Sequence, residues 1–103
     1  MGLTQKTGES YSEFALRVSI MAHRAFQSYD VAEEHGVDTF IRGILHNDFA
    51  YELRKDSVEY TRVEAVLKRL EHLDQSHKEI MRRKSRLVKS VSFENFGSTN
   101  QGP

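Results

Sequence analysis

Three polar residues near the start of the chain have types and spacing that suit a hydrogen-bonded clamp. Gln5 lies four residues before Glu9, and Arg17 follows Glu9 by eight residues. A glutamine amide both donates and accepts hydrogen bonds, and a carboxylate accepts them from backbone N–H groups. An arginine inside a helix can bind that carboxylate through a charge-assisted pair. We expect these residues to hold the N-terminal segment against the first helix, although their spacing alone also fits three unrelated surface residues.

A second group of residues stands out by its charge and lies near the other end of the sequence. The segment 78–89 contains six basic residues and a single acid. Its candidate contacts to RNA phosphates are Arg82, Arg83, Lys84 and Arg86. The segment has no aromatic side chain, so we expect no base stacking and a non-specific, salt-sensitive interaction. Two other interpretations stay open, namely a helix that bundles with its neighbours through heptad positions and a solvated helix end.

The residue types that build catalytic and metal sites are absent or unfavourably spaced. The chain has no cysteine, which excludes disulfides, cysteine-ligated zinc and thiol nucleophiles. His72 and His77 are five residues apart, so they do not share one helix face as two metal ligands would. Glu33 and Glu34 are adjacent and point in different directions on a helix, which makes them poor acid–base partners. We therefore predict that the protein is no enzyme, with no catalytic residue, cofactor, metal or small-molecule substrate.

The composition is typical of a single helical domain. The 103 residues are 38% hydrophobic and 29% charged, which suits a folded domain with a modest core. Fifteen Lys and Arg balance fifteen Asp and Glu, so the net charge favours no class of partner. No apolar run is long enough to cross a membrane, and we expect no membrane contact.

Apolar residues recur at helical spacing in four segments, which predicts an all-α fold. The first helix should span 10–27 and begin with a capping box formed by Ser10 and Glu13. The second should span 31–45, or begin properly at Val37, after a glycine that interrupts the pattern.

Two further helices are expected in the second half of the chain. A short helix should span 48–55. The last helix should begin at a capping box formed by Thr61 and Glu64. It can continue as far as Lys89 because neither glycine nor proline interrupts this stretch.

The clamp spacing resembles the major homology region in the C-terminal capsid domain of retroviral and retrotransposon Gag proteins. In that motif a polar loop with glutamine and glutamate leads into a helix with an aromatic residue and an arginine. The matching residues here are Gln5, Glu9, Phe14 and Arg17. Lys6 departs from the pattern, since retroviral sequences often have glycine after the glutamine.

Three further stretches resemble this family in the same order along the chain. The stretch 8–17 resembles the "GES…F…L" opening of Gypsy-type retrotransposon Gag. The stretch 38–44 resembles the "D-x-F-x-R-G-L" motif that follows, and 53–54 resembles its "ELR" element. The similarity as a whole runs from Gln5 to about Leu73.

The resemblance implies a small four-helix bundle like the capsid C-terminal domain, with an extended N-terminal strand-turn and a long last helix. It implies that the clamp is structural and important for particle assembly. It also implies that the second helix mediates two-fold dimerisation. The candidate interface residues are Val37, Phe40, Ile41 and Ile44, some of which must also contribute to the core.

We accordingly expect a capsid C-terminal-like domain over 1–75, a basic helical extension over 76–90 and a flexible tail over 91–103. The function that the resemblance implies is self-assembly of a Gag-like capsid protein, as a homodimer and a higher-order lattice that packages RNA in cytoplasmic virus-like particles. Its source would be an LTR (Gypsy-type) retrotransposon or a host gene domesticated from one. The alternatives are a SCAN-type dimerisation module of a transcription regulator and a small nucleic-acid-binding protein with a basic helix.

Overall fold

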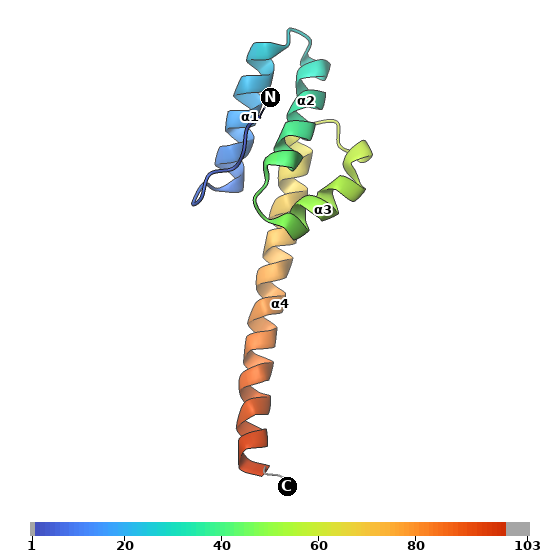
Figure 1. The fold of residues 1–103 in the computed structure, drawn as a ribbon. Helices are drawn as coiled ribbons and strands as arrows, with labels where there is room; N and C mark the ends of the chain where they lie inside the picture. The colour runs from blue at the N-terminus through green and yellow to red at the C-terminus, as the bar shows by residue number, and fades with distance from the viewer. Residues whose placement is uncertain (1, 99–103) are drawn as a thin grey trace. The chain divides into compact units, whose positions relative to one another are not determined.

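The computed structural model describes residues 2–98 of the chain, and the side chains of residues 2–86. Four α-helices and one 3₁₀ turn fill most of this range, and no residue within it belongs to a β-strand (Figure 1). The chain is all-α, which confirms the fold class predicted from the apolar spacing. It divides into two compact units, Met1–Leu73 and Asp74–Pro103.

The first unit begins with an antiparallel pair of helices, α1 (Tyr11–Ala25) and α2 (Tyr29–Gly43). They lie side by side and run in opposite directions (Figure 1). The capping box predicted at the start of α1 is present. The Ser10 hydroxyl accepts from the N–H of Glu13 at 3.1 Å, and the Glu13 carboxylate accepts from the N–H of Ser10 at 2.9 Å. Two N–H groups that lack a partner within the helix are thereby satisfied.

No break occurs where we expected a glycine to interrupt α2. The helix begins at Tyr29, and Ser28 caps it: the Ser28 hydroxyl accepts a hydrogen bond from the N–H of Val31 at 3.3 Å. Gly36 instead lies where α2 approaches Val63. A Cβ atom at Gly36 would come within 2.7 Å of Val63 Cγ2, so the missing side chain allows the close packing.

Two helices and a short turn complete the described chain. These are α3 (Asn47–Lys55), the 3₁₀ turn η1 (Ser57–Glu59) and α4 (Val63–Ser98). The last helix therefore continues past residue 91, where we expected the flexible tail to begin. A helix that has formed its first turns propagates at little cost until a breaker intervenes, and the first glycine of this stretch is Gly97. The rest of the predicted tail, 99–103, lies outside the described residues.

The core of the first unit is built by side chains from all four helices. Phe14 of α1 and Phe40 of α2 are fully buried, and their rings meet edge to face with centroids 5.4 Å apart. Leu53 of α3 and Leu70 of α4 are also fully buried and belong to the same cluster. Burying each of these side chains stabilises the fold by about 2–3 kcal/mol relative to leaving it in water. The core therefore fixes the helices that carry the candidate site.

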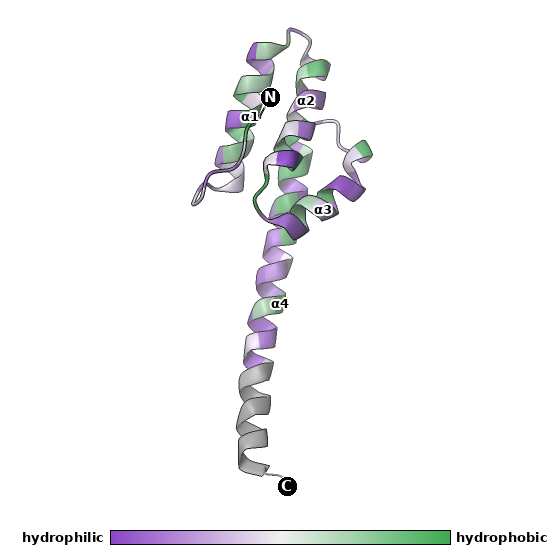
Figure 2. Cartoon of the chain, viewed as in Figure 1, coloured by the Kyte–Doolittle hydropathy of each residue, from purple (hydrophilic) through white to green (hydrophobic). Residues whose placement is uncertain are grey.

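The second unit has a different character. The residues 74–86, whose side chains the structure describes in this unit, are mostly hydrophilic (Figure 2). Ile80 and Met81 are the apolar exceptions within 74–86 and are 51% and 50% exposed. Among the described residues no helix combines the length and hydropathy that a membrane span requires.

Candidate functional site

Gln5 joins the N-terminal segment to two other parts of the first unit. Its backbone N–H donates to the carbonyl oxygen of Gly43, at the end of α2, over 2.8 Å. Its side-chain Nε2 donates to the carbonyl oxygen of Glu9 over 2.9 Å, and its Oε1 accepts from the N–H of Leu45 over 3.2 Å. The amide uses both its donor and its acceptor end, so neither a glutamate nor a lysine could replace all of these bonds.

The carboxylate of Glu9 binds one backbone group and one guanidinium. Arg17 donates from Nε to Oε2 at 2.7 Å and from Nη2 to Oε1 at 2.8 Å, a two-point pairing. Oε1 also accepts from the N–H of Lys6 at 2.9 Å. The same Nη2 of Arg17 donates to the carbonyl oxygen of Thr4 at 2.9 Å. Planar, charge-assisted bonds of this kind fix orientation as well as distance, so α1 is tied to the segment before it.

The clamp shifts the pKa of both of its charged members. The hydrogen bond from Arg17, followed by the one from the Lys6 N–H, lowers the pKa of Glu9 from 4.5 to about 2. The hydrogen bond to Glu9 raises the pKa of Arg17 in turn. A carboxylate with so low a pKa is a weak base and holds no proton to donate near neutral pH. The pairing therefore keeps both side chains charged at neutral pH.

Phe14 supports the clamp from the core side. Its ring is fully buried and lies 5.3 Å from the Arg17 guanidinium carbon. A Cβ atom added at Gly43 would overlap the Phe14 ring and come within 2.5 Å of the Leu3 carbonyl oxygen. Only glycine lets the N-terminal segment and this ring approach the end of α2 together. The glycine of the 38–44 motif thus has a packing reason, which the sequence pattern alone did not reveal.

The four residues proposed as a dimer interface on α2 and just after it are core residues. Val37, Phe40, Ile41 and Ile44 are 5%, 0%, 2% and 5% exposed. The prediction that they form a contact surface is wrong for the folded subunit, because the face that repeats at helical spacing is covered by the other helices of the same unit. An apolar stripe marks the buried side of a helix but does not say what covers it.

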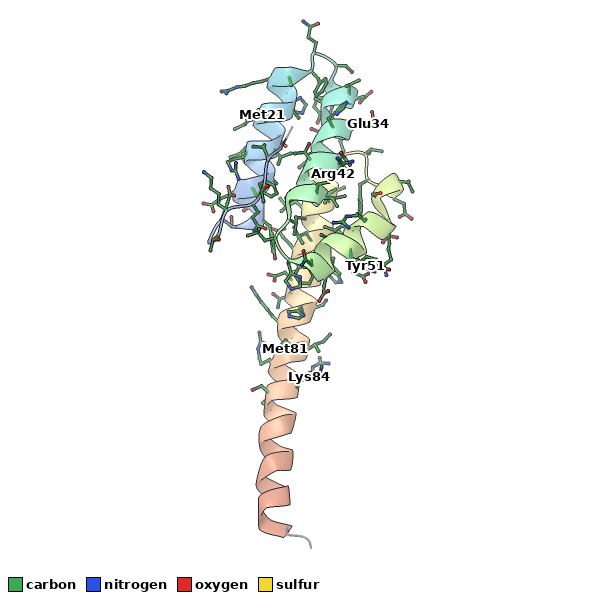
Figure 3. The ribbon with its side chains drawn as sticks, in the orientation of Figure 1. Met21, Glu34, Arg42, Tyr51, Met81 and Lys84 are labelled. Atoms are coloured by element: carbon green, nitrogen blue, oxygen red, sulfur yellow. The ribbon has the colours of Figure 1, made fainter. Side chains whose placement is uncertain are left out.

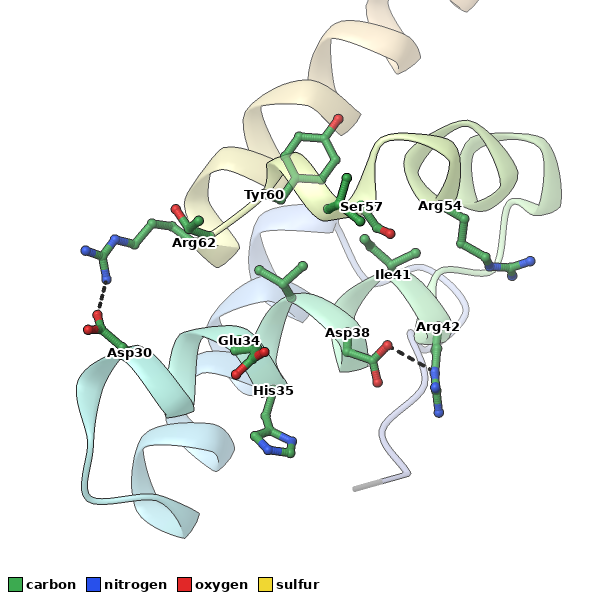
Figure 4. Close-up of a pocket in the computed structure, with 13 residues that line it drawn as sticks. Asp30, Glu34, His35, Asp38, Ile41, Arg42, Arg54, Ser57, Tyr60 and Arg62 are labelled. Carbon is green, nitrogen blue, oxygen red and sulfur yellow. Dashed lines mark ion pairs between the residues drawn. The ribbon is translucent and has the colours of Figure 1, made fainter.

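The exposed side of α2 borders an open groove instead. Its other wall is formed by η1 and the segment that leads into α4, and its volume is about 1040 Å³ (Figure 4). Asp30, Glu34 and Asp38 follow one another at four-residue intervals along α2. Asp38 pairs with Arg42 at 3.2 Å, and Asp30 lies 3.7 Å from Arg62 across the groove. The exposed residues of α2 along this groove are therefore mostly charged.

The basic residues proposed to bind nucleic acid lie in the second unit and are exposed. Figure 3 shows Lys84 projecting from α4. Arg82 and Arg86 are four residues apart and share one face, with Arg83 beside them. Lys84 points to the opposite side, because successive helical residues are rotated by about 100°. The structure therefore brings three of the four residues together on one side of the helix.

Glu33 is a buried acid, which the sequence alone presented only as a poor catalytic partner. It is 6% exposed. Its Oε1 accepts from the N–H of Val63, the first residue of α4, at 2.9 Å, and its Oε2 lies 2.6 Å from Nε2 of His23. Burial raises the pKa of Glu33, but the hydrogen bonds from His23 and the Val63 N–H outweigh it, so the pKa lies below the usual value.

This contact replaces the capping box that we expected at the start of α4. Thr61 and Glu64 are exposed, and α4 starts two residues after Thr61. The acceptor for the first N–H comes from another helix. The sequence did contain a signal for it, since Glu33 lies four residues before Val37 and so falls on the buried face of α2.

Comparison of the chain with family models, with curated proteins and with solved structures gave no match in any of the three cases.

Proposed function

We propose that this chain is a self-assembly subunit of a capsid-like shell, similar to the C-terminal capsid domain of Gypsy-type Gag proteins. The observation that carries the proposal is the clamp. Gln5, Glu9 and Arg17 are spaced as in the major homology region, and Glu9 binds Arg17 by two hydrogen bonds at the entrance of α1. The contact of Phe14 with the end of α2 supports it, because the motif residues at 8–17 and 38–44 then belong to one packed unit.

A shell places a particular physical demand on its subunit. The contacts between subunits are individually weak and repeated many times, so assembly depends on many small free energies acting together. If a subunit has to lose conformational freedom at each contact, the entropy cost reduces the free energy of that contact. A clamp that fixes the entrance of the domain lowers this cost, which is the assembly role we assign to it.

The test compares the full chain with two variants. Purified wild-type protein should self-associate with rising concentration, by sedimentation velocity, and form particles by negative-stain electron microscopy. Glu9→Gln should reduce both, because the neutral amide cannot make the two-point ionic pairing with Arg17. Glu59→Gln is the matched control: Glu59 is exposed and makes no ion pair among the described residues. Circular dichroism establishes that each variant is folded at the assay temperature.

Two results would contradict the proposal. One is a wild-type chain that stays monomeric at every concentration and salt condition. The other is a folded Glu9→Gln variant that assembles as well as wild type. A dimer that never proceeds to particles would favour the dimerisation module of a transcription regulator.

Nucleic-acid binding is a second candidate function, favoured by the exposure of the four basic residues on α4. Replacing Arg82, Arg83, Lys84 and Arg86 by glutamine should weaken binding to a labelled RNA of mixed sequence, measured by fluorescence anisotropy. The slope of log affinity against log salt should become shallower by about 0.7 for each phosphate contact removed. Unchanged affinity and slope would remove these residues from an RNA-binding role.

A further inference from the structure

The outward face of α1 carries large apolar side chains that are open to solvent. Leu16, Ile20 and Met21 are 61%, 45% and 42% exposed. Leu16 and Ile20 are four residues apart and so are neighbours on the helix surface, and Met21, which Figure 3 labels on α1, directly follows Ile20. A shallow hollow on this side of α1 is lined by Ile20 and Met21 together with Leu3, Arg17 and Arg24. Contiguous exposed apolar side chains on a soluble domain mark an interaction surface.

Two charges of opposite sign lie at the ends of this apolar strip. Glu13 is almost one turn before Leu16, and Arg24 is just over one turn after Ile20. Both are exposed. Glu13 uses one carboxylate oxygen in the capping box of α1. Arg24 forms no ion pair within the part of the chain that the structure describes.

The order of these charges selects one way of pairing two copies. Consider two α1 helices that lie face to face and antiparallel, with the two-fold axis at the middle of the helix. Glu13 of each helix then comes beside Arg24 of the other. Leu16 of each then faces Ile20 of the other, so the apolar strip covers itself. A parallel pair would instead bring Glu13 against Glu13 and Arg24 against Arg24, and like charges in contact disfavour that arrangement.

We propose that this face of α1 is a two-fold self-docking surface whose partner is a second copy of the same chain. A two-fold contact must be self-complementary, and the order acid, apolar strip, base satisfies that requirement when one copy is reversed. The inference rests on the proposed shell function, for which it supplies a subunit contact in place of the buried residues of α2. Three apolar side chains and two ion pairs cover less than the roughly 800 Å² per partner of a standard interface, so the isolated contact is weak.

The first experiment removes the apolar strip. Sedimentation velocity of the full wild-type chain over a range of concentrations should show a monomer–dimer equilibrium. The double variant Leu16→Ser, Ile20→Ser should stay monomeric, with unchanged circular dichroism because both side chains are exposed. Val58→Ser, which removes an apolar side chain that is 92% exposed on η1, is the control and should dimerise like wild type. Equal dimerisation of wild type and the double variant would overturn the proposal.

The second experiment reverses the charges. Arg24→Glu should weaken dimerisation, because the new carboxylate of one copy then lies beside Glu13 of the other. Adding Glu13→Arg in the same chain should restore it, since each new charge again meets its opposite. Thermal unfolding of both variants controls for the altered capping box. A double variant that dimerises no better than Arg24→Glu alone would overturn the antiparallel pairing.

The two levels of the proposal fail in different ways. Normal particles from the Leu16→Ser, Ile20→Ser variant, with its dimerisation unchanged, would remove the α1 surface and leave the shell function standing. Wild-type dimers that need Leu16 and Ile20 but never form particles would remove the shell function and leave the α1 surface.

Discussion

Glu9 and Glu33 each bind a basic side chain and a backbone N–H group, but they do so at different ranges along the chain. The partners of Glu9 are three and eight residues away, at Lys6 and Arg17. Those of Glu33 are ten and thirty residues away, at His23 and Val63. The first carboxylate ties a loop to the helix that follows it. The second joins three helices.

The two carboxylates also differ in their surroundings, because Glu33 is more deeply buried than Glu9. Both have a lowered pKa, and the cause differs. For Glu9 the bond from Arg17 dominates, whereas for Glu33 a large desolvation by burial opposes the bonds that lower the pKa. A buried carboxylate is tolerated only when its partners are in place. We therefore expect the folding free energy to fall more when a carboxylate in the core lacks its partners than when the clamp loses its carboxylate.

The largest effect should come from a carboxylate in the core that has no partner. Phe40→Asp removes a fully buried ring and puts a carboxylate in its place among apolar side chains. We expect a loss of more than about 4 kcal/mol of unfolding free energy and loss of the helical circular dichroism signal at room temperature. A folded, merely monomeric Phe40→Asp protein would mean that this ring forms an intersubunit surface after all.

Removing the partnered acid should have the next largest effect. Glu33→Ala leaves the first N–H of α4 and the His23 ring without their acceptor, and should cost about 2–3 kcal/mol by urea unfolding. Glu34→Ala is the matched control, since Glu34 is exposed and adjacent, and its effect should stay within about 0.5 kcal/mol. Equal effects of the two substitutions would show that the buried hydrogen bonds add nothing.

The clamp should show a smaller effect with a distinct pH dependence. The pKa of Glu9 is lowered on folding to about 2, from 4.5. A depressed pKa contributes stability that is present above pH 4.5 and is lost as the pH falls through about 2. Glu9→Gln should therefore be less stable than wild type at pH 7, and the difference should shrink between these two pH values. Urea unfolding of both proteins at several pH values measures it, and a difference that does not change with pH would contradict the ionic pairing.

Local patterns predicted the parts of the fold whose partners lie close in sequence. The all-α class and the Ser10–Glu13 capping box follow from the spacing of residues within one or two helical turns. The contacts of Glu9 with Gln5 and Arg17 belong to the same group, because all three residues lie within one loop and the start of one helix, whereas the bonds of Gln5 to Gly43 and Leu45 come from a distant segment. The partners of Glu33 were missed for the opposite reason: the helical spacing indicates that Glu33 is buried, but its partners come from two other helices and no local pattern contains them.

The sequence by itself determined where the helices form and which faces of them are apolar, since periodicity, caps and helix breakers act within a few residues. Only the tertiary structure decided what covers each face. It buried the apolar side of α2 within its own unit, left Leu16 and Ile20 of α1 exposed, and supplied Glu33 as the acceptor for α4. These outcomes depend on how separate helices pack into one small core. The apolar spacing within one helix does not determine which distant segment packs against it.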